Sequence, residues 1–182
     1  MRIITGIYKG KKINSPKHDG VRPTADRIKE SLFNIINDRI ENSIVLDLFG
    51  GTGALGIECL SRGANKAYIV DNDKRSIELI KQNLVNINNA YLYHLDYNVA
   101  LLNFYKKGIK FDIIFIDPPY ATKYGEFALK KIFDYDLLNE DGIIVWEYQT
   151  IQNKNQKIDL FEIYDNRNYG ETSIIFLKKK SD

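Results

Sequence analysis

The regular alternation of strand-like and helix-like segments from Ile44 onward is the feature that most limits how this 182-residue chain can fold. Apolar runs bounded by turn residues predict strands at residues 44–49, 67–70, 91–95, 111–116 and 142–147. Amphipathic runs between them predict helices at residues 54–62, 74–86 and 126–133. Parallel strands need such crossover helices, which cover both faces of the sheet. The sequence therefore predicts an α/β fold with a doubly wound, mostly parallel sheet.

Both ends of the chain predict additions to this sheet. Short β-like runs at residues 2–8 and 11–14 predict an N-terminal β-hairpin, and residues 157–164 and 172–178 predict two antiparallel strands, for seven in the main sheet. A helix capped by Thr24 is expected from Ala25 to about Arg39. Because no boundary follows residue 40, residues 1–182 are expected to form a single domain with residues 1–20 as an N-terminal extension.

Composition limits the setting in which the chain works. Its one cysteine cannot form an internal disulfide, which favours a reducing, intracellular environment. No apolar run approaches the ~20 residues of a membrane helix. The N-terminus turns basic without the apolar centre of a signal peptide. We therefore expect a monomeric, cytoplasmic protein with no membrane partner.

The positive charge is concentrated at the N-terminus. Residues 1–30 carry eight Lys and Arg against three Asp and Glu, whereas the other 152 residues carry 18 and 21. A basic arm on a mildly acidic body suits a partner made of phosphates, although a lysine-rich solvated face would look the same. The candidate contacts to such a partner are Arg2, Lys9, Lys11, Lys12, Arg22 and Arg27.

A glycine-rich turn joins the first predicted strand of the parallel sheet to the helix after it. Gly51, Gly53 and Gly56 satisfy the pattern G-x-G-x-x-G, which lets the backbone approach a nucleotide closely. Asp71 lies 20 residues after Gly51, at the end of the second strand, where a carboxylate can accept hydrogen bonds from ribose hydroxyls. Asp73 is an alternative for that role.

Asp47 favours S-adenosylmethionine over a dinucleotide as the ligand of this turn. Its charge would repel a pyrophosphate but suits the ammonium group of a methionine tail, and the chain has no separate substrate domain for a dehydrogenase. Asp47 could also cap backbone amides. At the end of the third strand, Asp96 is placed to meet the adenine amine and Tyr97 to lie near the ring. The candidate cofactor contacts are Asp47, Phe49, Gly50, Gly51, Gly53, Asp71, Asn72, Asp96 and Tyr97.

The fourth strand runs directly into Asp117-Pro118-Pro119-Tyr120, the candidate catalytic residues. Prolines remove backbone donors and leave rigid carbonyl acceptors, Asp117 adds a carboxylate, and Tyr120 adds an aromatic face for stacking. Hydrogen bonds from an exocyclic amine to Asp117 and the Pro118 carbonyl would aim its lone pair at a methyl donor, without any metal ion. A plain turn after a strand is the alternative explanation.

Together these motifs resemble the RsmD family of bacterial 16S rRNA guanine-N2 methyltransferases. The resemblance lies in four segments: Val21-Arg22-Pro23-Thr24-Ala25-Asp26-Arg27, Leu46 to Gly56, Phe115 to Tyr120, and Tyr169-Gly170-Glu171-Thr172. The resemblance covers essentially the whole chain. Gly51 and Thr52 stand where the family often has alanine and serine, and Asp71 where it usually has glutamate.

The resemblance implies a Rossmann-like class I methyltransferase fold and S-adenosylmethionine as the cofactor. It further implies methylation of a guanine N2 amine in 16S rRNA, at guanine 966, within the small subunit or its assembly intermediate. One alternative is an adenine-N6 methyltransferase of RNA or DNA, whose target amine would fit the same acceptors. Another is a non-catalytic RNA-binding protein that keeps the fold.

Overall fold

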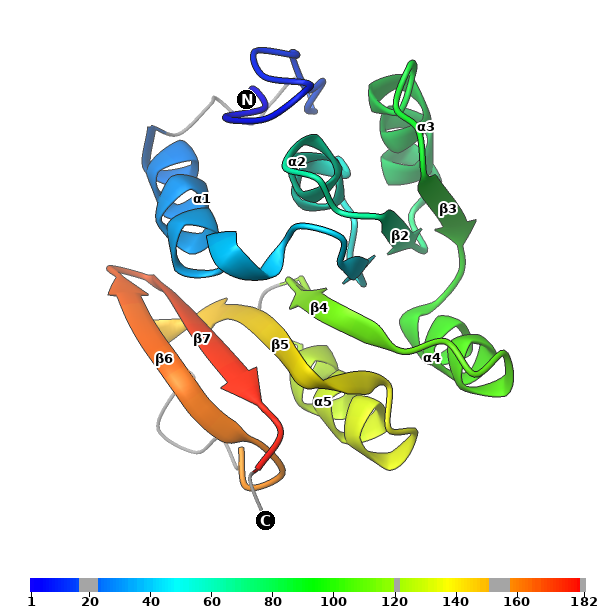
Figure 1. The fold of residues 1–182 in the computed structure, drawn as a ribbon, viewed down its shortest axis with the longest axis vertical. Helices are drawn as coiled ribbons and strands as arrows, with labels where there is room; N and C mark the ends of the chain where they lie inside the picture. Colours follow the sequence, from blue (N-terminus) through cyan, green and yellow to red (C-terminus); the bar gives the residue numbers. More distant parts are fainter. Residues whose placement is uncertain (17–22, 120–121, 151–157, 181–182) are drawn as a thin grey trace.

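The structure, a computed structural model, describes residues 1–16, 23–119, 122–150 and 158–180. Its centre is one seven-stranded sheet with the strand order β3-β2-β1-β4-β5-β7-β6 (Figure 1). The strands are β1 (Ile44–Asp47), β2 (Lys66–Asp71), β3 (Ala90–His94), β4 (Phe111–Ile116), β5 (Leu138–Gln149), β6 (Glu162–Tyr169) and β7 (Thr172–Lys178). Strands β1 to β5 are parallel, and β7 lies antiparallel between β5 and β6. The expected doubly wound sheet is confirmed.

Helices cover both faces of the sheet. They are α1 (Pro23–Ile35), the 3-10 helix η1 (Asn37–Arg39), α2 (Ala54–Ser61), α3 (Lys74–Asn83), α4 (Tyr97–Lys106) and α5 (Tyr124–Asp134). Helices α1 and α2 lie on one face of the sheet, and α4 and α5 lie on the other (Figure 1). Side chains of α1 and α2 share one apolar cluster with Val45 and Phe115, whereas those of α4 and α5 pack with Leu46 and Ile114. Neighbouring strand residues therefore point into different layers, as the alternation of side chains along a strand requires.

Two predicted elements differ from the structure in extent, and one helix was not predicted. The first helix begins at Pro23, a residue favoured at the first helical position, so Thr24 lies inside the helix and does not precede it. The first strand of the closing pair is β6, which spans residues 162–169 rather than 157–164. Helix α4 was not predicted from the sequence, although Ala100, Leu101 and Phe104 are buried at helical spacing.

The N-terminal hairpin is reduced to a single antiparallel bridge between Arg2 and Lys12. The amide nitrogens of Ile3 and Gly10 lie 3.0 and 2.9 Å from the carbonyl oxygens of Lys11 and Ile3. The predicted strand over residues 2–8 was wrong in its second half, because Gly6 has φ +88° and the chain turns there. A side chain at Gly6 would also collide with the Ser61 carbonyl oxygen, 1.6 Å from an added Cβ.

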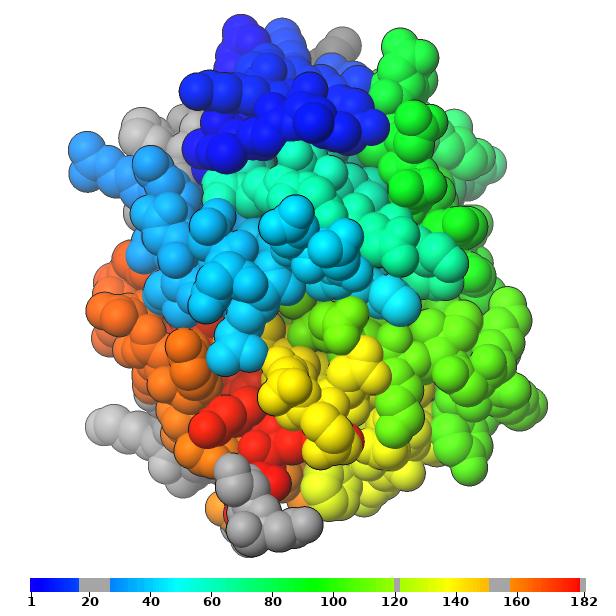
Figure 2. All heavy atoms as spheres, viewed as in Figure 1, coloured from blue at the N-terminus to red at the C-terminus, as the bar shows by residue number. Residues whose placement is uncertain are grey.

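Glu58 of α2 holds this N-terminal segment in place. Its carboxylate accepts the amides of Ile4 and Thr5 at 2.9 and 3.1 Å and forms ion pairs with Lys29 and Arg62 at 3.0 and 2.9 Å. Burial alone would raise the pKa of Glu58, but Lys29, the Ile4 amide and Arg62 outweigh it and lower the pKa. Figure 2 shows the blue N-terminal residues packed against the molecule's body. The segment is docked rather than extended into solvent.

Within the described residues, no helix is both long and apolar enough to cross a membrane.

Candidate functional site

A cavity of about 530 Å³ opens at the carboxyl ends of β1, β4 and β5. The strand order reverses between β1 and β4, and such switch points are where α/β sheets bind ligands. The glycine-rich turn after β1 forms one wall, and α1 with the turn between β6 and β7 forms another. Asp47, Asp117, Glu147 and Glu171 bring four carboxyl groups to its lining.

The glycine-rich turn has the shape that its sequence predicted. The amide nitrogen of Gly50 lies 2.7 Å from the Val70 carbonyl oxygen, and an added Cβ at Gly50 would come within 2.5 Å of Ile69 Cγ2. Gly53, which precedes α2, has φ +76°. Glycine meets the close approach at Gly50 and the positive φ at Gly53, and internal hydrogen bonds of the Gly50, Gly51 and Gly53 amides fix the shape of the turn.

Asp47 sits at the floor of the turn with 2% of its surface exposed. One carboxylate oxygen accepts the Gly56 amide at 3.2 Å, so the predicted capping interaction is present while the side chain still lines the cavity. Burial raises the pKa of Asp47 to about 7 against the effect of the Gly56 amide, and the charge of Asp71 adds to the rise. A cationic ligand would restore the ionised form, so the site suits an ammonium group.

Asp71 and Asp73 have different hydrogen-bond partners. The two carboxylate oxygens of Asp71 accept the amides of Gly51 and Asp73, each at 2.8 Å, which fixes the carboxylate beside the glycine-rich turn. Asp73 caps α3 by accepting the amides of Arg75 and Ser76 at 2.6 and 3.0 Å. Those bonds, the Ser76 amide first, lower the pKa of Asp73. Asp71 therefore stabilises the glycine-rich turn, whereas Asp73 caps helix α3.

The predicted adenine side lies outside the cavity lining, at the start of α4. Asp96 caps α4 by accepting the Asn98 amide at 2.9 Å. The buried ring of Tyr97 lies 5.3 Å from Phe49 and 5.3 Å from Tyr124, measured between ring centroids. Tyr124, partly exposed at the start of α5, was not singled out from the sequence. The carbonyl oxygen of Asn72, the residue after β2, lies 3.2 Å from His94 Nε2.

Asp117 follows β4 and lines the cavity. Burial, followed by the charges of Glu147 and Asp47, raises the pKa of Asp117 well above its usual range. The residue is exposed to the open cavity that it lines.

Two prolines, Pro118 and Pro119, follow Asp117 and contribute backbone carbonyl groups as acceptors. The Pro119 carbonyl oxygen accepts a hydrogen bond from Thr122 Oγ1 at 2.8 Å, which engages that acceptor within the turn. The carbonyl group of Pro118 is the acceptor that the sequence predicts for the target amine. Tyr120, the predicted stacking platform, lies outside the described residues.

Lys29 and Glu147 also line the cavity, and sequence reasoning missed both. Lys29 is on α1, and Glu147 is on β5 beside the end of β4. A carboxylate near the end of a fifth parallel strand is a signal that could have found Glu147. The hydroxyl groups of Ser31 and Tyr169, 2.5 Å apart, join α1 to the β6–β7 turn and complete this wall.

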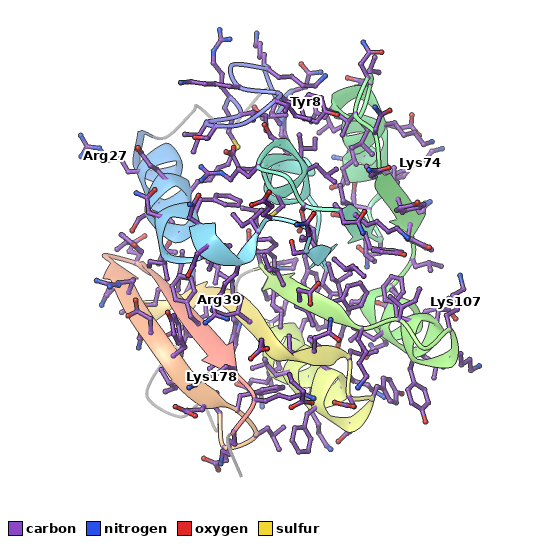
Figure 3. All side chains as sticks on the ribbon, in the orientation of Figure 1. Tyr8, Arg27, Arg39, Lys74, Lys107 and Lys178 are labelled. Carbon is purple, nitrogen blue, oxygen red and sulfur yellow. The ribbon has the colours of Figure 1, made fainter. Side chains whose placement is uncertain are left out.

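The candidate RNA contacts fall into two groups. Lys9 and Lys12 are exposed, and Figure 3 shows Arg27 extending away from α1. Lys11 and Arg2 instead donate within the protein, from Lys11 Nζ to the Val85 carbonyl oxygen at 2.7 Å and from Arg2 to the Gly10 carbonyl oxygen at 2.9 Å. Arg22 lies outside the described residues.

Comparisons with known proteins agree with this geometry. The chain is 36% identical over 183 residues to YlbH of Bacillus subtilis, named for rRNA methyltransferase activity, covering 99% of this chain and 100% of that protein. It is 35% identical over 150 residues to ribosomal RNA small subunit methyltransferase D of Haemophilus influenzae, covering 81% and 78%. The solved structure of the Escherichia coli methyltransferase yhhF superposes with a TM-score of 0.86 at 28% identity, covering 100% and 99%.

Residues 1–178 match the family model described as Conserved hypothetical protein 95. The expected family is thereby confirmed. The chain belongs to this family, the RsmD family, and is a methyltransferase of the rRNA small subunit methyltransferase D group.

Proposed function

We propose that this protein methylates the exocyclic N2 amine of one guanine in 16S rRNA, with S-adenosylmethionine as the methyl donor. Asp117 carries the proposal, because it follows β4 and lines the same cavity as the glycine-rich turn, with Pro118 as the next residue. A carboxylate and a carbonyl group there offer acceptors to a target amine. By resemblance to the RsmD family, the target is guanine 966 in the small subunit or its assembly intermediate.

The cofactor is S-adenosylmethionine, and the turn after β1 fits it. Asp47 would hold the ammonium group of the methionine tail, and Asp71 the ribose hydroxyls. Phe49, Gly50, Gly51 and Gly53 shape the turn, while Asn72, Asp96 and Tyr97 would bound the adenine. When bound, the cofactor supplies an electrophilic methyl group.

The protein's own groups position the amine for transfer. Hydrogen bonds to Asp117 and the Pro118 carbonyl would draw the nitrogen lone pair out of the base plane and towards the methyl group. The proton released after transfer can pass to the Asp117 carboxylate, whose raised pKa makes it a better proton acceptor than an ordinary aspartate. Tyr120 is proposed to stack on the base.

The basic arm is proposed to dock the RNA without taking part in the chemistry. Lys9 and Lys12 are exposed for phosphate contacts, and Arg22 and Arg27 belong to the same basic region. We further propose that the protein works as a monomer in the cytoplasm, as one domain over residues 1–182 with residues 1–20 serving as the RNA-docking extension.

Nucleoside analysis tests the proposal. Purified protein is incubated with labelled S-adenosylmethionine and small-subunit particles from cells that lack the gene, and the RNA is digested to nucleosides. We expect the label in N2-methylguanosine. Label in N6-methyladenosine would instead support the adenine-N6 alternative. Calorimetry separates the non-catalytic alternative, since a protein that only binds RNA should not bind S-adenosylmethionine.

A further inference from the structure

Asp117 and Glu147 are held side by side by the pairing of β4 with β5. Ile116 is paired with Trp146 in this parallel register, so the next residue on each strand is a carboxylic acid. Neighbouring strands lie about 4.8 Å apart. Trp146 packs in the core on the α4–α5 face, and Glu147, the next residue, lines the cavity together with Asp117.

The cavity around these two groups is rich in acceptors. Among the described lining residues Lys29 is the only one with a cationic side chain, and it is paired with Glu58 at 3.0 Å. The raised pKa of Asp117, caused by burial and by the charges of Glu147 and Asp47, reports the resulting crowding of negative charge. A ligand that brings several N–H donors to Asp117 and Glu147 would reduce the repulsion between these negative charges.

Guanine and adenine differ in what they offer to such a wall. On its Watson–Crick edge guanine carries two neighbouring donor groups, N1–H and the N2 amine. Adenine carries one amine beside N1, which is an acceptor. A second carboxylate next to the one that holds the amine can therefore accept a hydrogen bond from N1–H of guanine. With adenine, the same carboxylate would face the N1 acceptor, and the two acceptors would repel each other.

We propose that Glu147 selects guanine as the target base, by accepting a hydrogen bond from N1–H while Asp117 holds the N2 amine. This inference rests on the proposed guanine-N2 function and assigns its base specificity to β5. Glu147 is then a specificity-determining residue that touches the part of the base not undergoing reaction.

The test uses a base that keeps the amine and changes N1. 2-Aminopurine carries the same N2 amine, but its N1 is an acceptor and it lacks the O6 carbonyl, so the comparison of wild type with a Glu147 variant isolates the contribution of N1. Small-subunit particles are reconstituted with 16S rRNA carrying guanine or 2-aminopurine at the methylated position, and kcat/KM is measured for both. We expect the wild-type protein to prefer guanine by at least about 100-fold.

The Glu147→Gln variant should reverse much of this preference, because its amide can donate to N1 of 2-aminopurine. We expect kcat/KM for guanine to fall and kcat/KM for 2-aminopurine to rise, narrowing the ratio by at least about 100-fold. Glu171→Gln is the matched control, since it removes another cavity carboxylate, and it should keep the wild-type ratio. Cofactor affinity and thermal melting check that both variants are folded.

Three results would overturn the proposal. These are a wild-type ratio near one, equal losses on both substrates in Glu147→Gln, or a changed ratio in Glu171→Gln. If Glu147→Gln does not fold, Glu147→Ala takes its place, and an unchanged ratio in that variant would overturn the proposal. A wild-type protein that leaves guanine particles unmethylated would instead contradict the proposed function, which keeps the two failures distinct.

Discussion

The carboxylates of Asp47 and Asp71 at the glycine-rich turn accept hydrogen bonds from backbone amides, whereas Asp117 and Glu147, at the carboxyl ends of β4 and β5, lie side by side. Asp71 accepts the amides of Gly51 and Asp73, so the turn and its carboxylate are fixed before any ligand arrives. At the other wall, burial and the charge of Glu147 raise the pKa of Asp117. The cofactor half of the site, which is the glycine-rich turn with Asp47 and Asp71, is therefore preorganised. In the target half, which is Asp117 with Glu147, the arrangement of carboxylates becomes favourable only when a base with several N–H donors enters.

The largest effect is expected from Asp117→Ala. Removing the acceptor for the target amine should lower the single-turnover rate by about 10²–10³-fold, the scale of one preorganised polar contact at a reacting group. Cofactor affinity, measured by calorimetry, should change little. A near-normal single-turnover rate would remove Asp117 from the chemistry and erase the difference between the two halves.

Asp71→Ala tests the preorganised half. We expect S-adenosylmethionine affinity to weaken by about 1.5–3 kcal/mol, the scale of hydrogen bonds to a charged group. Asp73→Ala is the matched control, because it removes the cap of α3 and should lower folding stability with little effect on cofactor affinity. If Asp73→Ala weakens cofactor binding and Asp71→Ala does not, the ribose ligand has been assigned to the wrong carboxylate.

Asp47 should make cofactor binding depend on pH. Its pKa is about 7 in the empty protein and the ammonium ligand prefers the ionised form, so affinity should rise about tenfold from pH 6 to pH 8. Asp47→Asn should bind more weakly and lose this dependence. An unchanged pH profile in the variant would assign the titration to another group.

The raised pKa of Asp47 should also make the stability of the ligand-free protein depend on pH, with stability falling where cofactor affinity rises. Folded Asp47, with a pKa of about 7, binds its proton more tightly than an unfolded aspartate with a pKa of 3.8. The contribution of Asp47 to the free energy of unfolding should therefore fall as the pH rises between these two values. Denaturant titrations of wild type and Asp47→Asn across this interval measure the difference.

The smallest effect is expected from the basic arm, outside both halves. Lys9, Lys11 and Lys12 replaced together by Ala should reduce the salt dependence of particle binding, with turnover at saturation spared. Because Lys11 already donates to Val85, Lys9 and Lys12 should account for a slope change of about two contacts, and Lys11→Ala for little. Parallel salt curves with equal affinity for wild type and triple variant would leave the arm as a solvated face.

How well the sequence predicted each part depended on the range of the interactions involved. The β-strands of the parallel sheet and the glycine-rich turn are local patterns, so Gly53 and Asp71 could be found by spacing alone. Glu147 could not, because its place beside Asp117 depends on the register between β4 and β5. The docking of the N-terminal segment on Glu58 was missed for the same reason, since more than 50 residues separate Glu58 from Ile4.

Mapping of methylated nucleotides in 16S rRNA from cells with and without this gene tests the proposed function most directly. We expect one N2-methylguanosine to disappear with the gene and to return with the wild-type gene but not with Asp117→Ala. Loss of a methyladenosine, or no change in any modified nucleotide, would contradict guanine-N2 methylation by this protein.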